Sequence, residues 1–363
     1  MDIVALSHLR WDFVYQRPQH LLGRAARRHR VLFVEEPIEG EAFGLETAAQ
    51  GPSLTVVRPV VPTAMAPDET EARVASELRA LVGDWRTDEL VAWHYAVMAE
   101  QLSRDLDADV TVFDCMDQLS AFRGAPPGLV ERERALLDRS DIVFTGGHSL
   151  WEAKRRLHAR VHAFPSSVDR AHFATARLSN AEPDALAGIG RPRLAYAGVV
   201  DERLDLDLIA AVAESGIGEV VLIGPIAKID PHDVPSGPRI HQLGMRSYDE
   251  LPALFSHVDV GLMPFALNEA TRFISPTKTP EYLAAGLPVV STPITDVVRG
   301  YGDLDMVEIA AGPEAFVWAC RSALAAPRSL AAVDERLAGM SWDATWTAME
   351  GLIGDLLQGR EAA

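Results

Sequence analysis

The chain has 363 residues, of which 48% are hydrophobic and 24% charged, and its formal net charge is −18 at pH 7. This composition is typical of a globular protein with room for about two domains, and the acidic charge disfavours a protein that wraps nucleic-acid phosphates. Cys115 and Cys320 are its cysteines, too few for a disulfide scaffold or a Cys-based zinc site.

The first half of the chain alternates short apolar segments with helical patterns. Strands are expected at Ile3–Leu6, Val31–Val34, Leu90–His94, Val110–Phe113, Ile142–Thr145 and Val161–Phe164. Helices are expected at Pro18–Arg30, Ala96–Leu106, Leu129–Asp138 and Ser149–Leu157. Most of these strands are apolar without alternation, which indicates a parallel sheet with helices on both faces.

After an Ala-rich segment at Asp169–Arg191, expected to be a linker, the second half repeats this plan. Strands are expected at Arg193–Ala197, Val220–Ile223, Arg239–Leu243, Val258–Met263, Pro288–Ser291 and Met306–Ile309. Helices are expected at Leu206–Glu214, Tyr248–His257, Thr279–Ala285, Pro313–Ala325 and Trp342–Leu357.

The fold class predicted is α/β, with two Rossmann-like, doubly wound parallel-sheet domains facing a central cleft. The domains are expected at residues 1–170 and 171–340, and a helix at 341–363 is expected to pack back on the first domain. In such sheets ligands bind beyond the carboxyl ends of the strands. The loops that follow the strands are therefore the places to look for a site.

The ends of the chain and its hydropathy predict where it acts. The first residues have no basic flank, and no apolar stretch approaches the ~20 residues of a membrane helix. A cytoplasmic protein is expected. Arg24, Arg27, Arg28 and Arg30 form a basic patch that would suit the anionic inner face of a membrane. A solvated helix face explains the same patch more simply.

The most informative segment runs from Asp259 to Thr292, where a polar loop and a short helix lie between two buried strands. Ser275 is a plausible N-cap and Pro276 a plausible first helical residue. The amides of Thr277 and Lys278, the helix dipole and the Lys278 ammonium would then converge on one spot that suits a diphosphate. Glu281, one turn further on, could accept hydrogen bonds from ribose hydroxyls.

The alternative is that Lys278 and Glu281 form an exposed helical ion pair of small energetic value. The chain has only three lysines among its 34 basic residues, which favours a functional Lys278. A second, weaker signal is Gly198 with Arg203, which follow the strand at Arg193–Ala197 and could approach a phosphate. An ordinary strand–helix turn with a surface arginine would look the same.

In the first half, candidate residues also follow strand ends. Asp117 is the best general-base candidate by position, with a turn or N-cap as the alternative. His94 could meet a sugar, although a lone histidine is more often a structural one. Four further residues could line an acceptor site or simply pack: His8, Trp11, Arg17 and Gly146.

The segment with Ser275, Lys278 and Glu281 resembles the donor motif of retaining glycosyltransferases of the GT-B fold, group 1 (family 4-like). Its closest likeness is to the bacterial teichuronic-acid and exopolysaccharide branch, whose loop reads Ser-Pro-x-Lys-x-x-Glu-Tyr-Leu-Ala-x-Gly-x-Pro-Val-Val. Five segments of the first half resemble the same branch: 7–11, 16–21, 113–122, 144–150 and 164–169.

This resemblance implies transfer of a hexose from a nucleoside diphosphate sugar to an acceptor hydroxyl with retention, in polysaccharide or glycoconjugate biosynthesis. It implies no cofactor and no metal, because Lys278, Arg203 and the backbone at Ser275–Thr277 neutralise the diphosphate, while Glu281 binds the ribose. The acceptor would be a sugar or a lipid-linked sugar. No nucleic acid partner is expected.

The chain departs from the family at one position. Many relatives carry a second glutamate, separated from the ribose-binding one by seven residues, and Phe273 stands there in this chain. Glu269 or Asn268 could substitute for it. Two other functions remain open, a nucleotide-sugar epimerase of the same fold and a non-catalytic nucleotide-sugar binder. The sequence does not name the sugar, the base, the acceptor or the oligomeric state.

Overall fold

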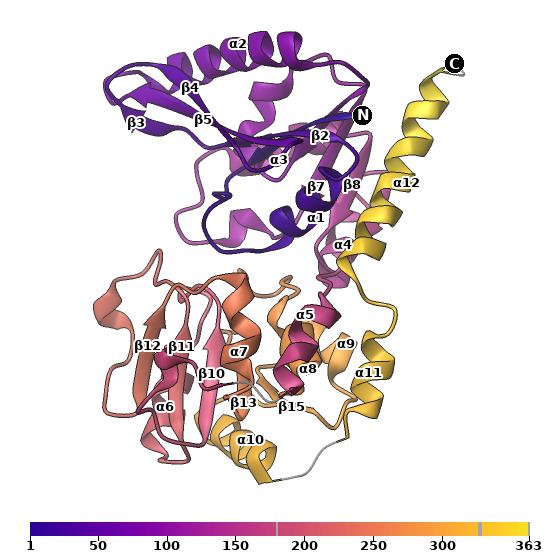
Figure 1. The fold of residues 1–363 in the computed structure, drawn as a ribbon. Coiled ribbons are helices and arrows are strands. Elements are labelled where there is room, and N and C mark those ends of the chain that lie inside the picture. The colour runs from indigo at the N-terminus through magenta and orange to yellow at the C-terminus, as the bar shows by residue number, and fades with distance from the viewer. Residues whose placement is uncertain (179–180, 326–328, 362–363) are drawn as a thin grey trace. The chain divides into compact units, whose positions relative to one another are not determined.

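The structure is a computed structural model that describes residues 1–178, 181–325 and 329–361. Its contacts divide the chain into two units: Met1–Pro165 with Asp343–Ala363 form unit 1, and Ser166–Trp342 form unit 2. The sequence placed the boundary near residue 170, a few residues later. Figure 1 shows the elements of both units.

Unit 1 is built on a nine-stranded sheet in the order β3-β5-β2-β1-β6-β7-β8-β9, with β4 antiparallel to β5. Its strands are β1 (Asp2–Ser7), β2 (Arg30–Glu35), β3 (Ile38–Gly40), β4 (Gly44–Ala49), β5 (Leu54–Pro62), β6 (Leu90–His94), β7 (Val110–Cys115), β8 (Ile142–Thr145) and β9 (Val161–Ala163). Strand order reverses between β1 and β6, so this point of the carboxyl edge is the topological switch point, where ligands bind in such sheets. The amides of Tyr95 and Ala96 bridge the two strands there by bonding to the carbonyl of Leu6, at 2.9 and 3.0 Å.

The helices of unit 1 connect successive strands. They are α1 (Arg17–Ala25), α2 (Pro67–Trp85), the 3₁₀ helices η1 (Val97–Ser103) and η2 (Leu119–Ala121), α3 (Leu129–Arg139), α4 (His148–Lys154) and the terminal α12 (Trp342–Glu361). The expected helix at Ala96–Leu106 is the 3₁₀ helix η1.

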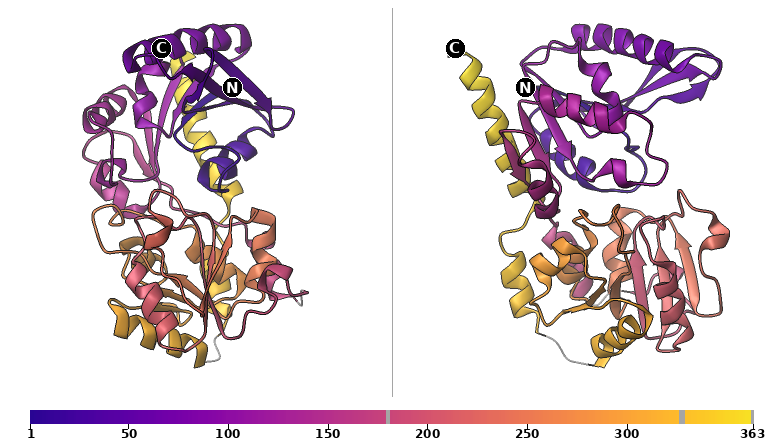
Figure 2. Two further views of the ribbon diagram at one scale, coloured as in Figure 1. Left: turned by 90° about the vertical axis from the view of Figure 1, so that its left-hand side faces the viewer. Right: turned by 180° about the vertical axis from the view of Figure 1, so that it is seen from behind.

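Helix α12 packs on unit 1, although it follows unit 2 in the chain (Figures 1 and 2). The ring of Trp346 lies 6.0 Å from that of Trp93 and 6.2 Å from that of His29. Glu350 accepts a hydrogen bond from His29 at 2.5 Å, and Asp343 pairs with Arg27 at 2.7 Å. Apolar and charged contacts together fix the helix on this unit.

Unit 2 has a parallel six-stranded sheet in the order β12-β11-β10-β13-β14-β15. The strands are β10 (Arg193–Ala197), β11 (Glu219–Ile223), β12 (Ile240–Gly244), β13 (Val260–Met263), β14 (Val289–Ser291) and β15 (Val307–Ile309). Numbered from β10, this is the doubly wound order 3-2-1-4-5-6, with the switch point between β10 and β13. Both units thus confirm the predicted fold class.

The longer helices of unit 2 fall into groups whose members contact each other, and short 3₁₀ helices lie between them. They are α5 (Arg170–Ala174), η3 (Thr175–Arg177), η4 (Asp184–Leu186), α6 (Leu206–Glu214), η5 (Pro231–Asp233), η6 (Tyr248–Glu250), α7 (Leu251–Phe255), α8 (Lys278–Ala285), α9 (Thr295–Tyr301), α10 (Pro313–Ala325) and α11 (Ala331–Leu337). Helices α6 and α10 contact each other, while α5, α7 and α8 form a second group. Right-handed crossovers on either side of the switch point require this separation.

The expected linker, Asp169–Arg191, contains α5, η3 and η4, and part of it lies outside the described residues. Strands β3, β4 and β5 and helices α2, α9 and α11 were not expected. Among the described residues, no helix has the length and apolar content needed to cross a membrane.

Trp346→Ala is expected to lower the free energy of unfolding of unit 1 by about 3–5 kcal/mol, because it empties a buried site between α12 and the sheet. The same change at Trp318, which is 67% exposed on α10, should cost less than about 0.5 kcal/mol. Urea denaturation followed by circular dichroism measures both. Equal effects of the two substitutions would show that α12 contributes little to unit 1.

Candidate functional site

The switch point of unit 2 is framed by two loops that are bonded to each other. The loop after β10 and the loop after β13 join through the amide of Ala266 and the carbonyl of Arg203, 2.8 Å apart. A second bond of 2.8 Å runs from the amide of Asp205 to the carbonyl of Pro264. The candidate donor residues on these two loops therefore belong to one structural unit.

Helix α8 carries the two residues singled out in the donor motif. Lys278 is its first residue, and its ammonium is ion-paired with Glu281. The side chains of Lys278 and Glu281 are 13% and 2% exposed, so the alternative interpretation, an exposed helical ion pair, does not hold. Burial raises the pKa of the Glu281 carboxyl, and the neighbouring Lys278 ammonium opposes this rise.

The helix begins one residue before the expected range Thr279–Ala285, but two residues after the start that an N-cap at Ser275 would give. Thr277, rather than Ser275, occupies the N-cap, and Pro276 precedes it in the loop. The helix ends at Gly286, as expected, where a φ of 88° suits glycine. The loop before the helix is anchored through the Ser275 carbonyl, which accepts a bond of 2.6 Å from the hydroxyl of Ser166.

The first turn of α8 has no side-chain cap. The hydroxyl of Thr279 in this turn is buried without a hydrogen-bond partner. By contrast, the N-terminus of α6 is capped by the carboxylate of Asp205, which accepts the amide of Leu208 at 3.3 Å. The start of α8, with its uncapped amides and a lysine, is therefore the better anion site of the two.

Arg203 is held over the β10–α6 loop by a carboxylate. Its Nε and Nη2 donate to both oxygens of Asp201 at 2.7 to 3.1 Å. Gly198 and Gly224 allow the loop after β10 to approach the loop after β11. A Cβ on Gly224, at φ 147°, would lie 1.9 Å from the Gly198 carbonyl oxygen. The loops after β10 and β11 therefore pack closely at Gly198, five residues before Arg203.

The loop between β13 and α8 holds the candidates for the missing glutamate. Asn268 and Thr271 exchange hydrogen bonds of 3.2 Å that close a turn. The Glu269 side chain is exposed and lies 3.6 Å from Arg272. Arg272 also stacks over the ring of Phe273. Glu269 is therefore a surface residue of this loop.

In unit 1, Arg17 is neither a solvated side chain nor an open ligand group. Its guanidinium donates to Asp114 of β7 at 2.8 to 3.1 Å and to the carbonyl of Phe164 at 2.8 Å. Both side chains are almost fully buried. The expectation that Arg17 lines the acceptor site is wrong for this structure, because its donors are engaged inside unit 1.

The loop after β1 is organised by Glu35, a fully buried carboxylate at the end of β2. It accepts the Trp11 amide at 2.8 Å, Arg58 at 2.6 Å and Arg10 at 3.1 Å. Burial alone would raise the pKa of Glu35, but these hydrogen bonds outweigh it and lower the pKa. The Trp11 ring packs edge-on against Phe33 at 5.0 Å, and His8 is half-buried in the same loop.

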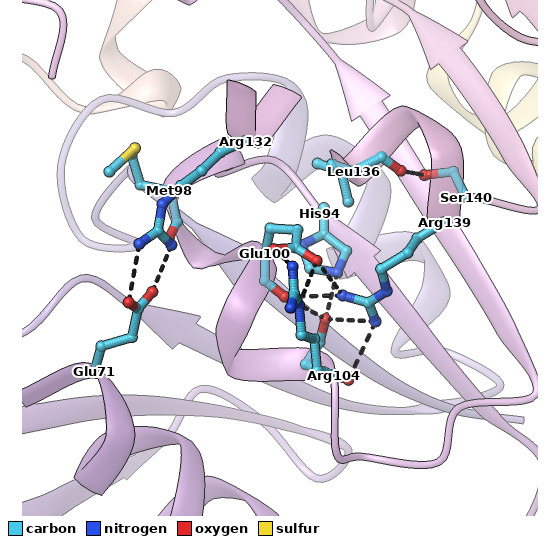
Figure 3. Close-up of polar contacts among 10 residues, drawn as sticks. Glu71, His94, Met98, Glu100, Arg104, Arg132, Leu136, Arg139 and Ser140 are labelled. Atoms are coloured by element: carbon cyan, nitrogen blue, oxygen red, sulfur yellow. Dashed lines mark hydrogen bonds and ion pairs between the residues drawn. The ribbon is translucent and has the colours of Figure 1, made fainter. Parts of the chain in front are cut away.

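His94 is fully buried and belongs to a polar cluster beside η1 (Figure 3). One ring nitrogen lies 2.9 Å from the Ser103 hydroxyl. Close by, the buried Glu100 carboxylate accepts bonds from Arg104 and Arg139. Burial, with the positive charge of Arg139, lowers the pKa of His94 to about 3. The structure therefore places His94 in the core as a neutral imidazole.

Asp117 and Gly146 follow adjacent strands at the carboxyl edge of unit 1. Asp117 is half-buried in a bend after β7, and Gln118 rather than Asp117 occupies the N-cap of η2. A Cβ on Gly146 would lie 2.6 Å from the carbonyl oxygen of Met116. Gly146 therefore allows the loops after β7 and β8 to pack closely.

The arginines of the expected basic patch are paired within unit 1. Arg24 and Arg27 contact Asp343 of α12, and Arg28 contacts Glu350. Arg30 lies over the Trp85 ring. Among the described residues, no group of three His, Cys, Asp or Glu side chains could hold a metal ion.

Several buried carboxylates of unit 1 were not singled out from the sequence. Asp114, Glu35 and Glu100 accept hydrogen bonds from arginines that are 97, 23 or 25, and 4 or 39 residues away along the chain. Only the strand-end positions of Glu35 and Asp114 could have drawn attention to them. Asp201, two residues from Arg203, was visible as a local acidic neighbour.

The fold is that of the GT-B glycosyltransferases, as comparison with solved structures shows. Sucrose-phosphate synthase of Thermosynechococcus elongatus is 15% identical, with a TM-score of 0.76 and 99% of each chain covered. An E. coli trehalose-6-phosphate protein bound with UDP-2-fluoro glucose is 14% identical, with a TM-score of 0.67 and 99% of each chain covered. The Burkholderia xenovorans trehalose-phosphate synthase in complex with glucose-6-phosphate is 13% identical, with a TM-score of 0.68, covering 98% of this chain and 99% of that one.

Sequence comparison points to one curated relative. A protein of Bacillus subtilis strain 168, named as a candidate teichuronic acid biosynthesis glycosyltransferase, TuaH, is 24% identical over 203 residues. The match covers 51% of this chain and 50% of TuaH, so the chain spans about half the length of this relative. No protein-family model matches the chain.

Asp114→Ala is expected to destabilise unit 1 by about 3–5 kcal/mol, because it leaves the Arg17 charge buried without its partner. Asp303→Ala, which removes an exposed partner of Arg336, should cost at most about 1 kcal/mol. The double variant Arg17→Met with Asp114→Leu should recover part of the loss. Equal urea midpoints for Asp114→Ala and Asp303→Ala would contradict the structural role of the pair.

His94 should make the protein less stable in acid. Its folded pKa of about 3 lies below the ordinary value of 6.5, so the unfolded chain binds a proton first as the pH falls. Stability is then lost below pH 6.5, by about 2 kcal/mol between pH 7.5 and 5. In His94→Gln this part of the pH slope should vanish, whereas His232→Gln, at an exposed histidine, should keep it.

Proposed function

We propose that the chain is a retaining glycosyltransferase that moves a hexose from a nucleoside diphosphate sugar to an acceptor hydroxyl. The observation that carries the proposal is the pairing of Lys278 with Glu281 at the uncapped start of α8, beside the switch point of unit 2. The GT-B fold and the likeness to TuaH support it. The product would be a cell-surface polysaccharide or glycoconjugate, and the acceptor a sugar or lipid-linked sugar.

Charge develops on the leaving diphosphate during such a transfer. The bond between the anomeric carbon and the diphosphate oxygen breaks, and its electron pair stays with the diphosphate. Lys278, Arg203 and the amides at the start of α8 would stabilise that charge, which is where preorganised donors contribute most. Protein cations then do the work that a metal ion does elsewhere, so no metal is needed.

The remaining candidates would serve the nucleoside and the acceptor. Glu281 would accept hydrogen bonds from the ribose hydroxyls. The acceptor oxygen forms the new bond on the face that the diphosphate leaves, and Asp117 would take its proton. Glu269 would approach the donor sugar if its loop closes over it. The acceptor itself would lie against the loops of unit 1 that carry His8, Trp11 and Gly146.

Lys278→Ala should abolish turnover and weaken binding of the nucleoside diphosphate by about 1.5–3 kcal/mol, because a charge-assisted contact is lost. Arg336→Ala removes another cation of unit 2, paired with Asp303, and should change neither. Calorimetric titration with UDP, GDP and dTDP measures affinity, and nucleotide release from the matching sugar measures turnover.

The same assay separates the proposed function from its alternatives. Release of nucleotide that depends on an acceptor supports a transferase. Binding without any turnover would indicate a nucleotide-sugar binder, and conversion of the sugar without an acceptor an epimerase. A Lys278→Ala variant with wild-type affinity and rate would refute the assignment of the site.

A further inference from the structure

Tyr282 lies one residue beyond Glu281 and is fully buried. Its hydroxyl accepts the amide of Ala197 at 2.6 Å and donates to the carbonyl of Ala195 at 3.3 Å. Burial raises the pKa of Tyr282 far above its ordinary value, so the hydroxyl keeps its proton at neutral pH. A side chain of α8 is thus hydrogen-bonded to the backbone at the carboxyl end of β10.

Strands β10 and β13 separate near their carboxyl ends, which explains why the bond from the Ala197 amide to the Tyr282 hydroxyl is needed. The two strands pair only through Leu194 with Val260 and Ala195 with Gly261. Beyond that point β13 supplies no partner for the buried amide of Ala197. An unpaired buried amide is costly, and the Tyr282 hydroxyl takes the place of the missing strand.

The strand also makes room for the ring. A Cβ on Gly261 would lie 2.6 Å from two ring carbons of Tyr282. On its other side the ring packs against Phe255 at 5.1 Å between centroids. The Tyr282 ring therefore packs on β13 at Gly261, while its hydroxyl is hydrogen-bonded to β10.

These contacts of Tyr282 connect the two parts of the candidate donor site, the start of α8 and the loop after β10. Lys278 and Tyr282 are four residues apart, so they lie on one side of α8 in successive turns. Ala197 directly precedes Gly198, which begins the loop that carries Arg203. The Tyr282 hydroxyl thus connects two elements by a direct hydrogen bond. One is helix α8, which carries Lys278, and the other is strand β10, which leads to Arg203.

We propose that Tyr282 is a positioning residue for the donor diphosphate, which sets the separation between the Lys278 ammonium and the Gly198–Arg203 loop. The proposal deepens the proposed function and rests on it. Tyr282 does not touch the diphosphate itself. It acts by fixing two groups that must bind one ligand together, and ordering them in advance removes a cost from binding.

The test is a double-mutant cycle between Tyr282→Phe and Lys278→Ala, read by calorimetric titration with UDP, GDP and dTDP. Tyr282→Phe keeps the ring on Gly261 and removes only the hydroxyl. We expect it to weaken the best-bound diphosphate at least fivefold in the wild-type background. In the Lys278→Ala background, where no ammonium remains to be positioned, the loss should be less than twofold.

Two controls separate positioning from a general loss of stability. Tyr301→Phe removes a half-buried hydroxyl of unit 2, which contacts the sulfur of Met340 at 3.8 Å, and should leave the affinity unchanged. The nucleoside of the best-bound diphosphate, which lacks phosphates, should bind Tyr282→Phe and wild type equally. Gly261→Ala, which displaces the ring, should reproduce the loss of diphosphate affinity if the variant folds.

The outcomes are distinguishable. If wild type binds a diphosphate and Tyr282→Phe binds it equally well, the positioning role is overturned while the proposed function stands. An equal loss in both backgrounds also overturns it, since the effect would not pass through Lys278. If wild type binds none of the diphosphates, the proposed function fails and the inference fails with it.

Discussion

The separation of β10 from β13 at their carboxyl ends is the constraint on which the candidate donor site depends. The strands share only two paired positions, and beyond them the backbone of each must find other partners. The β10 side uses the hydroxyl of Tyr282, and the loops use bonds between Arg203 and Ala266 and between Asp205 and Pro264. The backbone at the point where the two strands separate is thus satisfied by a few specific hydrogen bonds.

Unit 1 is organised by buried carboxylates near the carboxyl edge of its sheet. Glu35 and Asp114 lie in strands near the carboxyl edge, and each receives an arginine from a different segment. A buried charge is tolerated only where its hydrogen-bonding capacity is filled. These pairs therefore fix the loop after β1 and the start of α1, the elements expected to meet an acceptor.

How much of this the sequence predicts depends on the range of each interaction. Most strands were predicted because they are apolar throughout, but β5 was missed because Arg58, Pro59 and Pro62 interrupt its apolar pattern. Helix α2 was missed for a related reason. It buries only Val74, Leu78 and Val82, a seam too narrow to give a strong helical pattern.

The same distinction separates the two parts of the site. Lys278, Glu281 and Gly286 lie within one short segment, so spacing alone placed them on one helix and gave its end correctly. The start was misjudged because Ser275 and Pro276 are good helix-starting residues used instead in the loop. Arg17 was misinterpreted because its partner Asp114 is 97 residues away, and no local pattern connects them.

The charges of the candidate donor site bear on how an acidic chain would hold the proposed diphosphate. Each cation of the candidate donor site already has a carboxylate partner two or three residues away, Asp201 for Arg203 and Glu281 for Lys278. These partners hold the cations in place and cancel their charge at long range. A diphosphate would then have to compete with these carboxylates at short range, through hydrogen-bond geometry, since a protein of net charge −18 repels an anion at long range. Recognition at this site therefore depends on how accurately α8 and the β10 loop are placed.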